Sequence, residues 1–168
     1  MFHIYGLVVG IAIVVGWSVA ERIEPKVNKV APLVIGLGLL GARIYHVVDL
    51  WDYYSQNMWQ IWNLWNGGMS IWGGIIGGGL GWWVSGGDLK ILSAMVTGLP
   101  LAQAIGRIAN GVNGEFVQRV GILPWWGAEA LLDLMLFVLL RGSTPKYRIW
   151  IYLVCYGLIR LVLQPYRG

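Results

Sequence analysis

The sequence predicts an all-α, polytopic membrane helix bundle, on the strength of its composition and of its long apolar stretches. Hydrophobic residues make up 57% of the 168 residues and charged residues only 12%. An ordinary soluble domain has about a quarter of its residues charged. Mean hydropathy is +0.64. A chain with so little polar surface cannot cover a soluble core, so we expect one transmembrane domain over residues 1–168.

Six apolar stretches approach the roughly 20 residues that a helix needs to cross a bilayer. These stretches are residues 2–20, 31–51, 68–84, 91–110, 122–140 and 148–165. Many of the 11 tryptophans lie near their ends, as in aromatic belts at headgroup level: Trp17, Trp51, Trp82, Trp83, Trp125, Trp126 and Trp150. The segment 51–67 is aromatic and amphipathic, and we expect it to lie along the outer interface.

The orientation follows from the distribution of lysine and arginine over the connecting loops. Residues 21–30 and 141–148 carry three each, and residues 85–90 carry one. Residues 52–67 carry none, and residues 111–121 carry one. Because basic loops stay on the cytoplasmic side, six helices place both termini on the outer side.

This topology brings the polar residues of the apolar stretches to one level, the outer-leaflet side. They are Tyr5, Arg43, Arg107, Asn110, Asn113, Glu115, Glu129, Asp133, Arg160, Gln164 and Arg167. Charges inside a membrane are costly and usually face a cavity or each other. Arg107 and Asn110 share a helical face, because they are three residues apart. Arginines that converge at headgroup depth suit an anionic phosphate, which guanidinium binds in a bidentate fashion. The residues therefore predict a phospholipid-headgroup site.

Simpler roles exist for some of these residues. Arg43 could instead extend to the outer headgroups, and Arg160 could form a structural ion pair with Glu129 or Asp133. Neither His3 nor His46 has ligand partners at metal spacing, so we expect no metal and no cofactor. The net charge of +4 comes from the basic loops, and nothing indicates nucleic acid.

Glycines recur at four-residue spacing in the third apolar stretch. The pairs are Gly73 and Gly77, Gly74 and Gly78, and Gly77 and Gly81. Small residues at this spacing let a neighbouring helix approach closely, so we expect tight helix packing here.

The motifs resemble those of one known family, the prolipoprotein diacylglyceryl transferases. GRIANGVNGE at 106–115 is similar to the family signature, roughly G-R-x-x-N-F-x-N-G/Q-E. Further motifs occur in the family's order: IYGL at 4–7, GARIYHVV at 41–48, WNGGMSIWGG at 65–74, Pro124 to Glu129, and YGLIR at 156–160. The resemblance covers nearly the whole chain.

The resemblance implies transfer of the diacylglyceryl group of phosphatidylglycerol to the lipobox cysteine of a prolipoprotein signal peptide, with release of glycerol phosphate. It also implies a multi-pass protein of the bacterial cytoplasmic (inner) membrane whose active site faces the outer leaflet. Arg107 and Arg160 would hold the phosphate. The implied catalytic residues are Arg107, Asn110, Glu115, Arg160 and Tyr5. The implied substrate-binding residues are Arg43, Asn113, Gly114, Trp72 and Glu129.

The chain departs from the family's pattern at several positions. Trp72 stands where a histidine is common, Gln164 where a glutamate is usual, Ser93 where an aspartate is common and Gln118 where the signature has glycine. The extracytoplasmic head insertion and the final helix usual in the family are expected to be missing. These changes leave an alternative, a catalytically weakened relative that binds phosphatidylglycerol or a signal helix, or a transferase with another acceptor.

Overall fold

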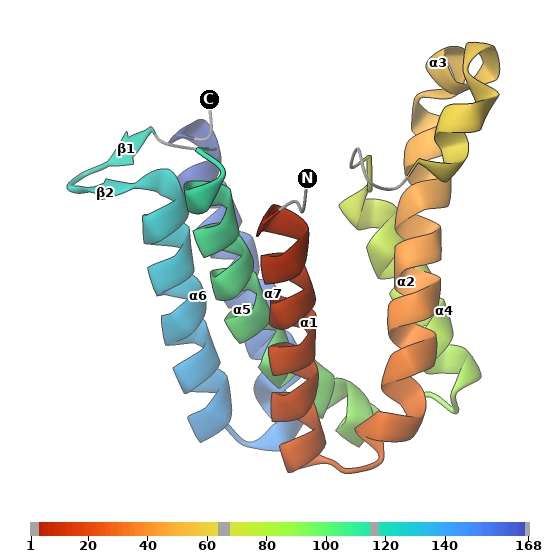
Figure 1. The fold of residues 1–168 in the computed structure, drawn as a ribbon. Helices are drawn as coiled ribbons and strands as arrows, with labels where there is room; N and C mark the ends of the chain where they lie inside the picture. Colours follow the sequence, from red (N-terminus) through yellow and green to blue (C-terminus); the bar gives the residue numbers. More distant parts are fainter. Residues whose placement is uncertain (1–3, 64–67, 115–117, 167–168) are drawn as a thin grey trace. The chain divides into compact units, whose positions relative to one another are not determined.

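The computed structural model describes residues 4–63, 68–114 and 118–166, and helices dominate these residues (Figure 1). The helices are α1 (Ile4–Ile23), α2 (Val27–Asp49), α3 (Trp51–Gln56), η1 (Met58–Trp62), α4 (Ile71–Val84), α5 (Leu89–Val112), α6 (Trp125–Gly142), α7 (Pro145–Leu163) and η3 (Gln164–Tyr166). Each predicted apolar stretch overlaps one of the longer helices over most of its length, which confirms the helical fold class.

One short antiparallel hairpin was not expected. β1 (Arg119–Val120) pairs with β2 (Leu123–Pro124), and Gly121 takes a positive φ of 62° between them. Pro124 has extended backbone angles, so α6 begins at the next residue. The predicted stretch 122–140 is therefore wrong at its start, because its first three residues belong to the hairpin.

The lengths of the helices fit a membrane protein. Three of the described helices are long and apolar enough to cross a bilayer, namely α1 over Gly6–Ile23, α2 and α5. Helix α4 has 14 residues, which is about 21 Å at 1.5 Å per residue, less than the roughly 30 Å hydrocarbon core. The chain is therefore a helical membrane protein, and six spans with both termini outside stay a prediction.

The chain divides into two compact units, of which unit 1 comprises Met1–Val27 and Leu89–Gly168. Helix α5 is its central helix, because α1, α6 and α7 all pack against it (Figure 1). The contact with α1 is close: a side chain at Gly98 would run into the backbone oxygen of Gly16. The start of α1, the end of α5, the hairpin, the start of α6 and the end of α7 lie at one end of this unit (Figure 1). We call it the polar end.

Unit 2 comprises Asn28–Asp88 and contains most of α2 with α3, η1 and α4. The buried residues of α4 are Gly73, Gly77 and Gly81. A side chain at Gly73 would run into the backbone oxygen of Gly41, and one at Gly77 into that of Leu37. The tight packing predicted from the glycine spacing is therefore confirmed, and the partner is α2.

Candidate functional site

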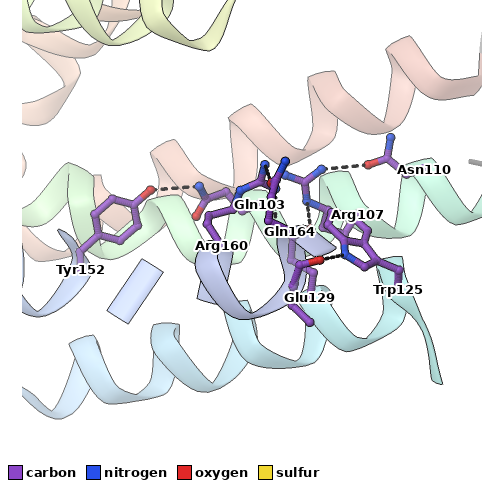
Figure 2. Close-up of polar contacts among 9 residues, drawn as sticks. Gln103, Arg107, Asn110, Trp125, Glu129, Tyr152, Arg160 and Gln164 are labelled. Atoms are coloured by element: carbon purple, nitrogen blue, oxygen red, sulfur yellow. Dashed lines mark hydrogen bonds and ion pairs between the residues drawn. The ribbon is translucent and has the colours of Figure 1, made fainter. Parts of the chain in front are cut away.

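Glu129 is the centre of an ion-pair cluster at the polar end of unit 1 (Figure 2). Its side chain is fully buried, in the second turn of α6. Arg160 of α7 donates a hydrogen bond from one terminal guanidinium nitrogen to Glu129 Oε1 over 3.2 Å. Arg107 of α5 places its Nε 3.1 Å from Glu129 Oε2, at ion-pair distance without the alignment of a hydrogen bond. One carboxylate therefore holds arginines from two other helices.

Each arginine has a second support. Arg107 lies over the ring of Trp125, with 5.5 Å from its guanidinium carbon to the ring centroid, and its NH1 is 3.4 Å from Asn110 Oδ1. Arg160 donates from its other terminal nitrogen to Gln164 Oε1 over 3.2 Å. The side chains of Arg107 and Arg160 remain 20% and 26% exposed. A guanidinium has five N–H donors, so both keep donors for a ligand.

Trp125 corrects one sequence expectation. Its position near the end of an apolar stretch predicts a place in an aromatic belt at headgroup level, but its side chain is fully buried. Its indole N–H donates to the backbone oxygen of Leu163 over 2.8 Å, and its ring supports Arg107. A tryptophan beside a partly buried cation gains from the interaction of charge and ring, and the last turn of α7 satisfies its one polar side-chain atom.

A second group of polar side chains lies one to two turns farther from the polar end. It consists of Gln103 on α5, Asp133 on α6, and Tyr152 and Tyr156 on α7, and we call it the deep polar layer. Gln103 donates to the hydroxyl of Tyr152 over 3.0 Å, and the two tyrosine rings stack at 5.4 Å. The sequence patterns single out neither Gln103 nor Tyr152, and they include Tyr156 only as part of the YGLIR motif. Their spacing could have indicated two of them, because Gln103 precedes Arg107 by four residues and Tyr156 precedes Arg160 by four. Residues four apart lie on the same face of a helix.

The end of α5 carries the rest of the signature. A side chain at Gly111 would run into the ring of Trp126, so glycine is required where α5 and α6 meet. Asn113 and Gly114 are exposed just past the helix, and Gly114 has a φ of 74° that favours glycine. Glu115 lies outside the described residues, and so does the side chain of Tyr5, whose backbone is in the first turn of α1.

Two predicted site residues lie in unit 2. Arg43 is 7% exposed, and its guanidinium donates to the backbone oxygens of Gln60, Ile61, Asn63 and Gly68 over 2.5–3.2 Å. The alternative of a side chain extended to the headgroups is therefore wrong, because Arg43 turns inward and fastens the connection between α2 and α4. Trp72, in the first turn of α4, is 63% exposed. The binding roles assigned to both residues stay predictions.

Two residues that depart from the family pattern form hydrogen bonds between or within helices. Gln164 lacks the charge of a glutamate but still offers an oxygen to Arg160. Ser93 donates to the backbone oxygen of Pro145 over 2.9 Å, which joins α5 to the start of α7. Among the described residues, no three His, Cys, Asp or Glu side chains group as a metal site would require.

The arrangement suits an anion. Arg107 and Arg160 supply two positive charges and Glu129 one negative charge, so the three side chains carry one positive charge in excess. Their low exposure strengthens any electrostatic contact with a ligand. Fold and site together define a helical membrane protein with a cationic, partly buried site at one end of a helix unit.

Comparison with known proteins agrees with the motifs. The family model described as prolipoprotein diacylglyceryl transferase matches residues 1–168. The chain belongs to this family, which confirms the resemblance found in the sequence.

Three relatives carry the name phosphatidylglycerol–prolipoprotein diacylglyceryl transferase. The protein of Clostridioides difficile is 34% identical over 97% of this chain and 77% of its own length. That of Finegoldia magna is 28% identical over 97% of this chain and 78% of its own length. That of Fervidobacterium nodosum is 44% identical over 52% of this chain and 32% of its own length. No solved structure matches this chain.

Proposed function

We propose that this protein transfers the diacylglyceryl group of phosphatidylglycerol to the thiol of a lipobox cysteine, forming a thioether and releasing glycerol phosphate. The observation that carries the proposal is the pair Arg107 and Arg160, held by the buried carboxylate of Glu129 at the polar end of unit 1. Membership of the transferase family supplies the reaction, and the names of the relatives supply both substrates.

The chemistry needs cations at the phosphate. When the thiol sulfur attacks the glyceryl carbon, the bond from that carbon to the phosphate oxygen breaks and the phosphate keeps the electron pair. Donors fixed in advance around the leaving group stabilise this growing charge, and they act more strongly where water is excluded. Arg107 and Arg160 would meet the phosphate with the N–H groups that Glu129 leaves free.

Other residues complete the proposed site. Glu129 would act through the two arginines as a positioning residue, because it is fully buried behind them. Asn110 would orient the glyceryl oxygens from the face of α5 that carries Arg107. Tyr5 and Glu115 are proposed as further catalytic residues. Asn113, Gly114, Arg43 and Trp72 are proposed to bind substrate, each from its own unit.

The proposed orientation follows from the charge distribution of the loops, and the bacterial cytoplasmic membrane follows from the transferase family. The basic loops would lie in the cytoplasm, and the polar end of unit 1 would face the outer leaflet of a bacterial cytoplasmic membrane. Phosphatidylglycerol and the cysteine at the outer end of a signal helix would meet there. Six spans with both termini outside belong to the same proposal.

A direct assay tests the function. Purified protein in detergent is incubated with phosphatidylglycerol and a peptide that carries one lipobox cysteine, and the peptide is then weighed by mass spectrometry. We expect a gain equal to one diacylglyceryl group on the cysteine, and none on a peptide with serine in its place. An unchanged peptide mass, with phosphatidylglycerol still bound to the protein, would reject the transferase and favour the lipid-binding alternative.

A further inference from the structure

Asp133 is a charged residue beside this site to which the proposed function gives no role. Its side chain is fully buried, and neither carboxylate oxygen has a hydrogen-bond partner among the described residues. A carboxyl group in an apolar interior is costly unless it is paired or hydrogen-bonded. A buried ionisable group without a partner beside a binding site is therefore a candidate for a functional role.

Asp133 belongs to the deep polar layer, whose depth is set by the helices. Gln103 precedes Arg107 by four residues, and Asp133 follows Glu129 by four. Because α5 ends at the polar end and α6 begins there, both residues lie one turn farther from that end, about 6 Å along the helix axis. Gln103 Oε1 is also buried without a hydrogen-bond partner among the described residues. The deep polar layer therefore holds hydrogen-bond acceptors without a partner among the described residues, on Asp133 and Gln103, one turn farther from the polar end than the arginines.

The geometry of the proposed reaction leads to this layer, and the inference rests on the proposed function. With the phosphate between Arg107 and Arg160, the acyl chains of the lipid extend toward the apolar interior, and the glyceryl carbon that reacts lies between the two. A displacement at carbon is in line, so the sulfur must approach opposite to the phosphate oxygen. The sulfur then lies on the interior side of the carbon, at the level of the deep polar layer.

We propose that Asp133 accepts the proton of the acceptor thiol directly when the two substrates are bound. The S–H bond breaks and its proton moves to an oxygen of Asp133, while the electron pair left on sulfur forms the new S–C bond. The bond between the glyceryl carbon and the phosphate oxygen breaks, and glycerol phosphate leaves with that electron pair. Asp133 returns the proton to water after the products depart. This step supplies the thiolate, which is the effective nucleophile.

The surroundings of Asp133 support this assignment. The charged and titratable groups that face it are Glu129 on its own helix, Arg107 on α5, and Arg160, Tyr152 and Tyr156 on α7. Two cations and one anion thus act on a carboxyl group that has no hydrogen bond of its own among the described residues.

The variant Asp133→Asn tests the proposal, because asparagine has the same shape and cannot take up the proton. Transfer to the lipobox peptide and retention of phosphatidylglycerol are measured from pH 5.5 to 9. We expect lipid retention within about twofold of wild type and a transfer rate at pH 7 about 100-fold lower. The remaining rate should rise about tenfold per pH unit up to the pKa of the peptide thiol, about 8.5. Glu24→Gln, the same kind of change at the opposite end of unit 1, should leave rate and pH profile unchanged.

Each other outcome decides a different point. A transfer rate for Asp133→Asn within about threefold of wild type, with the same pH profile, would overturn the proposal and leave the transferase intact. No transfer by the wild-type chain would reject the proposed function instead. If Asp133→Asn does not fold, the proposal is tested on wild-type protein instead, through the pH dependence of its transfer rate at saturating phosphatidylglycerol. The proposal requires that the wild-type transfer rate depends on a second ionisation, at a lower pH than the ionisation of the peptide thiol. A transfer rate that follows only the ionisation of the thiol would overturn the proposal.

Discussion

Arg160 on α7 donates a hydrogen bond to Glu129 on α6 over 3.2 Å, although the two residues are 31 positions apart in the sequence. The same carboxylate lies 3.1 Å from Arg107 on α5. A single buried group therefore sets the positions of both guanidinium groups and fixes their separation before any ligand arrives. Such preorganisation removes part of the cost of assembling a charged site around a ligand.

Replacing Glu129 by glutamine should lower both stability and activity. Breaking a buried ion pair from one side costs about 3–5 kcal/mol, and we expect about 1–3 kcal/mol here because Arg107 and Arg160 keep 20% and 26% exposure. The freed arginines lose their fixed separation, so transfer should fall at least about tenfold. Thermal unfolding in detergent and the transfer assay check this. Equal unfolding temperatures and rates for Glu129→Gln and wild type would contradict the role of Glu129.

Lysine should be unable to take over the function of Arg107 or Arg160. One ammonium group cannot face the Glu129 carboxylate and also give the planar, paired contact that a phosphate accepts from guanidinium. We expect Arg107→Lys and Arg160→Lys to lose about 10- to 100-fold in transfer, with a raised KM for phosphatidylglycerol. Arg141→Lys, at the exposed opposite end of α6, serves as the control and should behave like wild type. Full activity of both cluster variants would show that only charge matters.

Two glycines of the signature helix should respond in opposite ways to alanine. A side chain at Gly111 would run into the ring of Trp126, whereas one at Gly106 meets nothing within 4 Å. Gly111→Ala should therefore destabilise unit 1 by about 1–3 kcal/mol. Gly106→Ala should be neutral or stabilising by up to about 1 kcal/mol, because alanine favours a helix interior. Thermal unfolding of the two variants side by side is the measurement. Equal effects would mean that α5 and α6 do not meet at Gly111.

Arg43→Lys should loosen the connection between α2 and α4. The guanidinium of Arg43 serves four backbone oxygens between Gln60 and Gly68, and a lysine reaches fewer of them. Limited proteolysis should then cut within residues 57–63 at least about fivefold faster than in wild type, a change equal to about 1 kcal/mol of local stability. Arg22→Lys in unit 1 is the control. An unchanged cutting rate with reduced transfer would instead favour a direct contact of Arg43 with the lipid.

The helices and much of the site could be predicted from the sequence. Apolar stretches mark the helices because a bilayer requires a continuous apolar length, and the alternation of basic loops predicts that Arg107, Glu129 and Arg160 lie at one level. The pairing of Arg160 with Glu129 was one of two alternatives, since Asp133 is on the same face of α6. Only the packing of α5, α6 and α7 decides between them.

Other features depend on contacts that no local pattern reveals. Trp125 follows a proline at the start of an apolar stretch, which is typical of an interfacial residue. Its burial depends on the hairpin and on the last turn of α7, where Leu163 accepts its N–H. The inward turn of Arg43 likewise depends on backbone oxygens 17–25 residues away, and a charged residue in an apolar helix does not specify its partner.

The central claim is that Arg107 and Arg160 hold the phosphate that leaves as glycerol phosphate. The most direct test follows both products in one reaction, with phosphatidylglycerol carrying labelled phosphate and a lipobox peptide as acceptor. The account predicts one labelled glycerol phosphate for each modified cysteine in the wild-type chain, and neither product from Arg107→Ala or Arg160→Ala. Modified peptide formed at the wild-type rate by either alanine variant, or labelled phosphate that stays with the lipid while the peptide gains mass, would contradict it.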